Sequence, residues 1–136
     1  MSAAIRVVVY RVGKPPVVEE IDPDDLGVLQ ALVGGYLEHV ELPAGLHLWC
    51  NEDGARGQPL NRLVRARPVP PAKLRSQGGA YDFIVFLGGK KPGEVEGDYH
   101  RVYGTFFLSR TRGTELASVT DADLKRLGIN DKEKPQ

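Results

Sequence analysis

Apolar residues at the start of the chain predict a β-hairpin. Ile5 to Val12 is rich in β-branched residues, which is typical of a buried central strand. Val17 to Ile21 supplies a second short strand after the turn residues Gly13-Lys14-Pro15-Pro16. We therefore expect the first two strands of the chain to pair with each other.

The next segment has the start and stop signals of a helix. Asp22 can accept backbone hydrogen bonds as the N-cap, and Pro23 suits the first helical position, where its missing N–H costs nothing. The sequence predicts a helix from Asp24 to Val33 that ends at Gly34-Gly35. The apolar stripe that we expect to dock on the sheet consists of Leu26, Leu29, Leu32 and Val33.

Two alternating segments, Tyr36 to Leu42 and Leu46 to Asn51, predict a second hairpin. With a three-residue turn, His39, Glu41 and His47 share one face of this hairpin and resemble a set of zinc ligands. With a two-residue turn the two histidines lie on opposite faces and the set disappears. We expect a solvated sheet face and no metal site.

From Gly54 to Ala80 neither the helical nor the strand period is sustained, and proline and glycine recur, so a long loop is expected. Tyr81 to Leu87 and Val102 to Ser109 are predicted strands, joined by a polar insert at 88–101. A strand at Leu116 to Val119 precedes a helix capped by Thr120 and ended by Gly128. The expected domain spans 1–129, and 130–136 is expected to be a disordered tail.

The overall charge of the chain is balanced. Its 136 residues contain 18 Lys and Arg against 18 Asp and Glu, which excludes a general electrostatic attraction to nucleic acid or to an anionic membrane. A single cysteine excludes an internal disulfide, no signal peptide is recognisable, and no apolar segment approaches the roughly 20 residues that span a bilayer. We expect a cytoplasmic protein that does not bind membranes.

Charge is nevertheless concentrated locally. Residues 54–80 contain no acid and six cations, which are Arg56, Arg62, Arg65, Arg67, Lys73 and Arg75. A basic loop of this kind can bind a phosphate backbone or an acidic protein surface, although arginines also simply keep a loop soluble. We expect a protein or nucleic-acid partner to bind here, without base stacking, because the segment contains no aromatic residue.

Four short motifs occur in a distinctive order: VGGY at 33–36, NEDG at 51–54, NR at 61–62 and GTFF at 104–107. With this series the chain resembles the small bacterial, phage and plasmid proteins of domain-of-unknown-function family 3846, from Ile5 to about Leu124. It departs from their pattern in two long inserts, Leu63 to Ala80 and Gly88 to Arg101. The resemblance implies a compact α+β domain and a mobile-element context. It implies no reaction and no catalytic residue.

The polar residues of these motifs, Asn51, Glu52, Asn61 and Arg62, are candidate binding residues. In one interpretation they serve only turns, as Asn or Asp before Gly commonly does. In the other, Glu52 and Arg62 flank a loop mouth and orient a polar ligand. Cofactors are not expected, since Gly88-Gly89-Lys90-Lys91 lacks the first glycine and the hydroxyl of a phosphate loop.

These observations predict a single α+β domain with a mixed or antiparallel sheet of five to seven strands. One main helix packs on a face of this sheet, a short helix lies near the C-terminus, and a β-grasp-like arrangement is the alternative. The expected function is that of a non-enzymatic accessory or regulatory binding module. The alternative is a small enzyme that uses Glu52 and a histidine as acid and base on a polar substrate.

Overall fold

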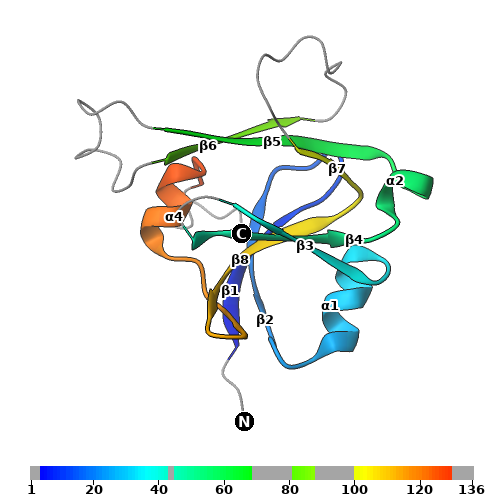
Figure 1. Cartoon of the computed structure of the whole chain (residues 1–136), viewed down its shortest axis with the longest axis horizontal. Coiled ribbons are helices and arrows are strands. Elements are labelled where there is room, and N and C mark those ends of the chain that lie inside the picture. The colour runs from blue at the N-terminus through cyan, green and yellow to red at the C-terminus, as the bar shows by residue number, and fades with distance from the viewer. Residues whose placement is uncertain (1–3, 43–44, 69–80, 88–99, 130–136) are drawn as a thin grey trace.

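The computed structural model describes residues 4–42, 45–68, 81–87 and 100–129, and it contains two antiparallel sheets (Figure 1). In the larger sheet the strand order is β2-β1-β8-β4-β3, and β9 pairs with β8 outside this path. Its strands are β1 (Ile5–Tyr10), β2 (Val17–Ile21), β3 (Leu37–Glu41), β4 (His47–Asn51), β8 (Phe106–Arg112) and β9 (Glu115–Ala117). The central strand, β8, comes late in the chain and joins β1 to β4.

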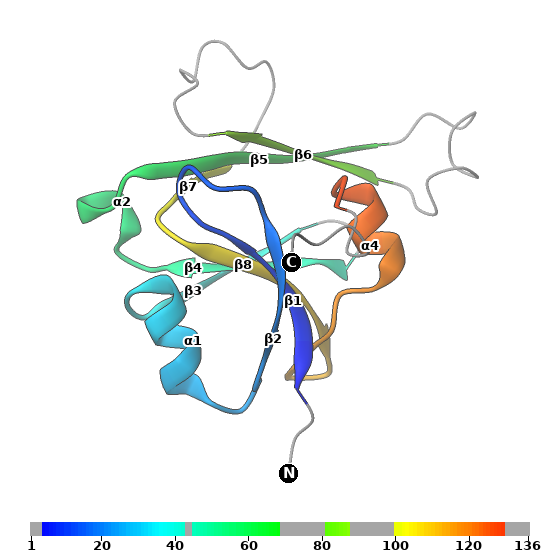
Figure 2. The same ribbon diagram turned by 180° about the vertical axis from the view of Figure 1, so that it is seen from behind.

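The smaller sheet covers one face of the larger one (Figure 2). Its order is β6-β5-β7, with β5 at Leu60–Pro68, β6 at Tyr81–Leu87 and β7 at His100–Tyr103. Val64 and Val102 of this sheet join Val8, Leu48 and Leu108 of the larger sheet in one buried cluster. This cluster is the main core, because it fills the space between the two sheets.

Helix α1 (Leu26–Val33) covers the opposite face of the larger sheet. Leu29 and Val33 are buried there with Val7, Val9 and Phe107. The helix and its stop at Gly34, which has a left-handed φ of 82°, confirm the expected element. Leu26 was wrongly assigned to the docking stripe, because it is 56% exposed and lies in the first turn, beyond the edge of the contact.

The N-cap of α1 also differs from the expectation. Asp25 caps the helix by accepting a hydrogen bond from the Val28 N–H, 3.1 Å away. Asp22 instead accepts from the N–H of Asp24, and its carbonyl accepts from the N–H of Asp25, so it closes a turn before the helix. Three aspartates, Asp22, Asp24 and Asp25, lie before the helix, and because Asp22 closes a turn the helix begins only at Leu26.

The long loop expected from Gly54 to Ala80 is wrong over residues 54–68. A short helix, α2 (Gly54–Gly57), is followed by β5, which pairs with both β6 and β7. Leu63 and Val64 are buried, so β5 is the central strand of its sheet and not an exposed connection. The remainder of that segment, 69–80, lies outside the described residues, as do 88–99 of the polar insert and the tail 130–136.

One predicted strand, Val102 to Ser109, is divided in two. Gly104 has a φ of 73°, a conformation that ends β7 and turns the chain into β8 in the other sheet. Apolar residues continue across this turn because both strands face the shared core, so the sequence pattern does not mark the break.

Near the C-terminus, α4 (Asp121–Arg126) lies beside the smaller sheet, and Thr120 and Asp123 form its capping box. Asp123 is fully buried and accepts hydrogen bonds from Arg110 Nε at 2.6 Å and Nη2 at 2.7 Å. All strand pairs are antiparallel, which confirms an α+β domain with one main sheet. None of α1, α2 and α4, the helices in the described ranges, is long and apolar enough to cross a membrane.

Candidate functional site

Asn51 connects the end of β4 to the end of α1. Its Nδ2 donates to the carbonyl oxygen of Val33 at 3.3 Å, and its Oδ1 accepts from the N–H of Asp53 at 2.8 Å. The Val33 carbonyl belongs to the last turn of α1, where backbone acceptors have no partner within the helix. Asn51 therefore satisfies a helix end and a turn, which agrees with its structural interpretation.

The glycines of the first motif fit this contact. A Cβ at Gly35 would lie 2.7 Å from the Asn51 Nδ2, too close for any other residue without displacement of the amide. Gln58, which follows α2, points its Nε2 toward the same Val33 carbonyl from 3.5 Å. The VGGY and NEDG motifs thus meet at a single packed junction.

Asn61 and Arg62 form a second buried junction. Asn61 Nδ2 donates to the carbonyl oxygens of Tyr10 and Gly104, each at 2.8 Å. Arg62 Nη1 donates to Asn61 Oδ1 at 2.6 Å, and its Nη2 donates to the carbonyl of Lys14. The Arg62 guanidinium also lies 5.6 Å from the centre of the Tyr10 ring.

Burial dominates the electrostatics of this second junction. Arg62 is only 2% exposed, and burial lowers the pKa of its guanidinium, although the neighbouring Tyr10 acts in the opposite direction. Burial likewise raises the pKa of Tyr10, while the Arg62 charge opposes that rise. The Arg62 guanidinium already donates hydrogen bonds to the Asn61 side chain and to the Lys14 carbonyl. Its role here is therefore to hold β5 against the β1–β2 turn.

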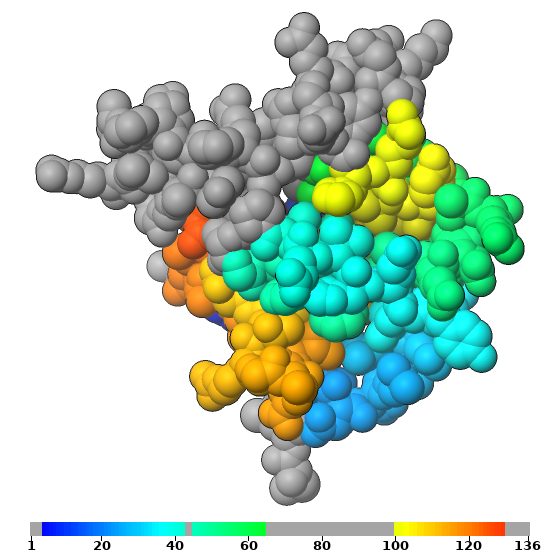
Figure 3. Space-filling view, in the orientation of Figure 1, coloured from blue at the N-terminus to red at the C-terminus, as the bar shows by residue number. Residues whose placement is uncertain are grey.

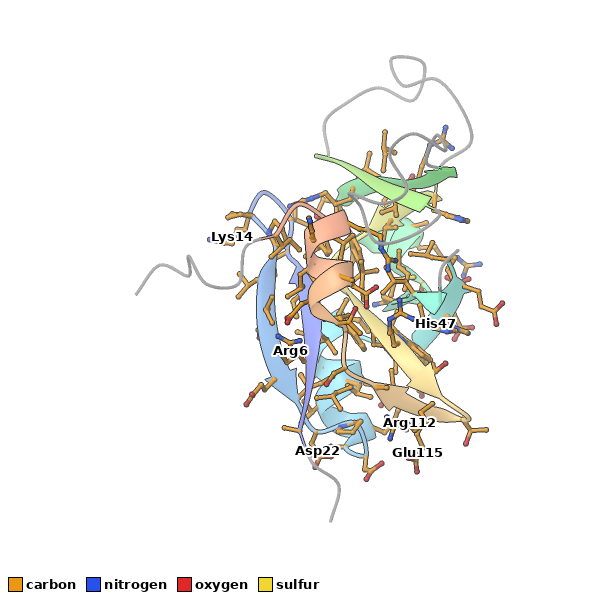
Figure 4. All side chains as sticks on the ribbon, turned by 90° about the vertical axis from the view of Figure 1, so that its left-hand side faces the viewer. Arg6, Lys14, Asp22, His47, Arg112 and Glu115 are labelled. Atoms are coloured by element: carbon orange, nitrogen blue, oxygen red, sulfur yellow. The ribbon has the colours of Figure 1, made fainter. Side chains whose placement is uncertain are left out.

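Glu52 is not combined with Arg62 in a loop mouth. Glu52 is exposed at the turn after β4, whereas Arg62 is buried and bonded to Lys14. Figure 4 shows Lys14, whose carbonyl accepts from Arg62, on the opposite side of the domain from His47. The four motif residues therefore occupy two structural junctions and one exposed turn.

Glu52 is also distant from the histidines of the second hairpin. His47 lies five positions before it along β4, about 16 Å in an extended strand. His39 is paired with Trp49, three positions before Glu52, or about 10 Å. Within the described ranges no contact brings Glu52 to either of these two imidazoles, so neither is paired with it as acid and base.

The second hairpin has the register of a three-residue turn. Glu41 is paired with His47 and His39 with Trp49, and the two imidazoles stack with ring centres 4.7 Å apart. His39 Nε2 lies 2.5 Å from His47 Nδ1, and Thr111 Oγ1 lies 3.2 Å from His47 Nε2. Burial, followed by the His39 charge, lowers the pKa of His47. Within the described ranges no group of three or more ligand-type residues could hold a metal ion.

Trp49, which the sequence analysis did not single out, lies beside His39 on the same face of the β3–β4 hairpin. Trp49 stacks on His39 with ring centres 4.5 Å apart, and its Nε1 donates to Ser109 Oγ at 2.9 Å. Ser109 belongs to β8, 60 residues further along the chain. Only the order of strands in the sheet brings them together, so no local motif could have indicated this pair.

The basic segment is divided by the fold. Arg56 is exposed in α2 and Arg62 is buried, while Arg65 and Arg67 lie at alternate positions of β5. Leu63, two residues before Arg65, is paired with Arg101 of β7, an exposed cation that was assigned to the polar insert. Lys73 and Arg75 lie outside the described residues.

Comparison with known proteins leaves the activity open but identifies the family. No curated protein and no solved structure matches the chain. The family model for the domain of unknown function DUF3846 matches residues 5–129, a range that includes every motif of the two buried junctions. The chain therefore belongs to the DUF3846 family.

Proposed function

We propose that this chain is a non-enzymatic accessory or regulatory module, of mobile-element origin, that binds a nucleic acid through its basic segment. The observation that carries the proposal is that residues 54–80 contain six cations and no acid while the whole chain is neutral. Arg62 is buried and bonded within the domain, so it is not available to a partner. We assign partner binding to the other five cations, which are Arg56, Arg65, Arg67, Lys73 and Arg75.

The rigid start of β5 supports this assignment. Because Asn61 and Arg62 fix β5 to the Tyr10 strand, the strand that carries Arg65 and Arg67 is held in place by the domain. The register of β5 with β7 pairs another cation, Arg101, with Leu63, two positions before Arg65. A strand whose backbone is already ordered loses less conformational entropy on binding a phosphate backbone than a loop would. An acidic protein surface is the second partner that these cations would suit.

Fluorescence anisotropy with a labelled DNA duplex and a labelled single strand tests the proposal. We expect affinity to fall steeply between about 50 mM and 200 mM salt, since each phosphate contact releases counterions. The double variants R65S/R67S and K73S/R75S should both weaken binding and reduce the salt dependence. The double variant R112S/K125S removes two exposed cations from other elements and should bind normally.

The same titration distinguishes the partner classes. Binding to poly-glutamate but not to either DNA would indicate an acidic protein partner. Equal binding by all three double variants would contradict the proposal, because the basic segment would then make no specific contribution.

A further inference from the structure

Strand β3 is an edge of the larger sheet, and its backbone has a defined open side. The Leu42 N–H donates to the Leu46 carbonyl, and the Glu52 N–H donates to the Tyr36 carbonyl. In an antiparallel ladder, hydrogen-bonded pairs alternate with pairs that are not hydrogen-bonded. By this alternation the backbone N–H and C=O groups of Glu38 and Val40 point toward β4. The N–H and C=O groups of Leu37, His39 and Glu41 therefore point away from the sheet.

This edge lacks the lysine, the proline and the bulge that often block strand addition, although it carries two glutamates. Residues 37–41 contain no lysine and no proline, and their register with β4 runs without a bulge. Glu38, His39 and Glu41 are exposed, and Figure 3 shows the cyan atoms of this part of the chain uncovered on the near face of the molecule. The edge is accessible to another extended chain.

The charge around the edge selects the kind of chain that would fit. Residues 26–55 contain four acids, Glu38, Glu41, Glu52 and Asp53, and no lysine or arginine. Glu38 and Glu41 lie in β3 itself, and the exposed Glu52 and Asp53 follow at its Tyr36 end. A strand added here would lie in a negative field with no cation of β3 or β4 to oppose it.

The side chains beside the edge add a suitable surface for cations. His39 and Trp49 are paired across β3 and β4, and their stacked rings are held by the Trp49 to Ser109 hydrogen bond. Aromatic faces attract guanidinium and ammonium groups. A basic side chain on this face of an added strand could reach both the rings and the Glu41 carboxylate.

From these observations we propose that the β3 edge binds an extended basic peptide of a partner protein as an additional strand. Backbone hydrogen bonds would come from Leu37, His39 and Glu41, and preference for Lys or Arg from Glu38 and Glu41. This site is separate from the basic segment and attracts the opposite charge. It would let the module hold a basic protein segment independently of any nucleic acid.

Amide hydrogen exchange measured by NMR provides the direct test. The probe is a synthetic peptide of about ten residues that alternates Arg and Thr. On addition of the peptide, the amides of Leu37, His39 and Glu41 should exchange about tenfold more slowly, whereas those of Glu38 and Val40, already bonded to β4, should not change. No protection at the three odd-numbered residues would overturn the proposal.

Variants test the charge preference. E38Q/E41Q should weaken peptide binding about tenfold at low salt, while E20Q/D24N, with the same loss of charge at exposed positions elsewhere, should bind normally. His39→Pro should abolish binding, because it removes an N–H that points to the open edge and that β3 does not need for folding. Its melting temperature verifies the fold. If the odd-numbered amides are already protected without peptide in a concentration-dependent way, a second copy occupies the edge and the proposal is wrong.

Discussion

The side chain of Asn61 and the backbone of Gly104 are joined by a buried hydrogen bond of 2.8 Å from Nδ2 to the carbonyl oxygen. Asn61 lies in β5 of the smaller sheet, and Gly104 is the turn that leads into β8 of the larger one. The same amide donates to the carbonyl of Tyr10 in β1. One side chain therefore fastens both sheets at the point where the chain passes between them.

Removal of this amide should destabilise the protein strongly. Asn61→Ala leaves two buried carbonyl groups without a donor, and each costs about 1–3 kcal/mol. We expect the free energy of unfolding in urea to fall by about 2–4 kcal/mol. Asn51→Ala removes a 3.3 Å bond to the Val33 carbonyl and a bond from the exposed Asp53 N–H at a half-buried position, and should cost only about 1 kcal/mol. A similar small loss for both variants would contradict this role of Asn61.

Two leucines of α1 should differ in their contribution to stability. Leu29 is 3% exposed and packs in the α1 core, so Leu29→Ala should lower the free energy of unfolding by about 2–5 kcal/mol. Leu26 is 56% exposed, and Leu26→Ala should change it by no more than about 0.5 kcal/mol. Denaturant titration of both variants measures the difference, and equal losses would show that α1 docks in another orientation.

The ion pair of Arg110 with Asp123 should make stability depend on acidic pH. Burial of Asp123 favours its neutral form, but the hydrogen bonds from Arg110 and Thr120 outweigh burial and hold its pKa below the ordinary value. The folded state therefore releases this proton more readily than the unfolded state. The resulting stability is present above about pH 4 and is lost as the pH falls through the lowered pKa.

Denaturation at a series of pH values tests this pair. Asp123→Asn should lower stability by about 3 kcal/mol at neutral pH, because Arg110 and Arg126 lose their buried counter-charge. It should also flatten the fall in stability below about pH 4. Asp121→Asn is a suitable control, since the Asp121 side chain is exposed and should change neither quantity appreciably.

His47 should titrate below the ordinary histidine value of about 6.5. Burial and the charge of His39 lower its pKa, and Glu41 acts in the opposite direction. NMR titration should therefore show the His47 pKa moving upward in His39→Gln and further downward in Glu41→Gln. Because His47 binds a proton less readily in the folded state than in the unfolded state, protonation favours unfolding. The free energy of unfolding should therefore decline as the pH falls below about 6.5. An unshifted His47 in the parent protein would contradict the stacked geometry.

The elements with local signals were predictable from the sequence. The hairpin of β1 and β2, the stop of α1 at Gly34 and the capping of α4 by Thr120 each depend on residues within one or two turns of the chain. The sequence left two turn lengths open for the β3–β4 hairpin, and the pairing of Glu41 with His47 fits the three-residue turn.

The features that were missed depend on distant contacts. Strand β5 reads as a loop because its arginines interrupt the apolar alternation, and the burial of Arg62 becomes possible only where Lys14 and Asn61 supply acceptors. The division at Gly104 is hidden because both flanking strands face one core. The partners of Asn51 and Asn61 are backbone carbonyls far along the chain, which a motif cannot specify.

The late position of β8 has a consequence for synthesis on the ribosome. Until Phe106–Arg112 has been made, β1 and β4 lack the strand that separates them, and each has an unpaired edge. The hairpins β1–β2 and β3–β4 can form early, but they join only through β8, in long-range pairs such as Val8 with Leu108 and Leu48 with Leu108. The nascent chain thus leaves the edge of β1, and later also that of β4, unpaired until β8 has been made. Chaperone binding to nascent chains should be strongest before β8 emerges and should decline once it inserts between its two neighbours.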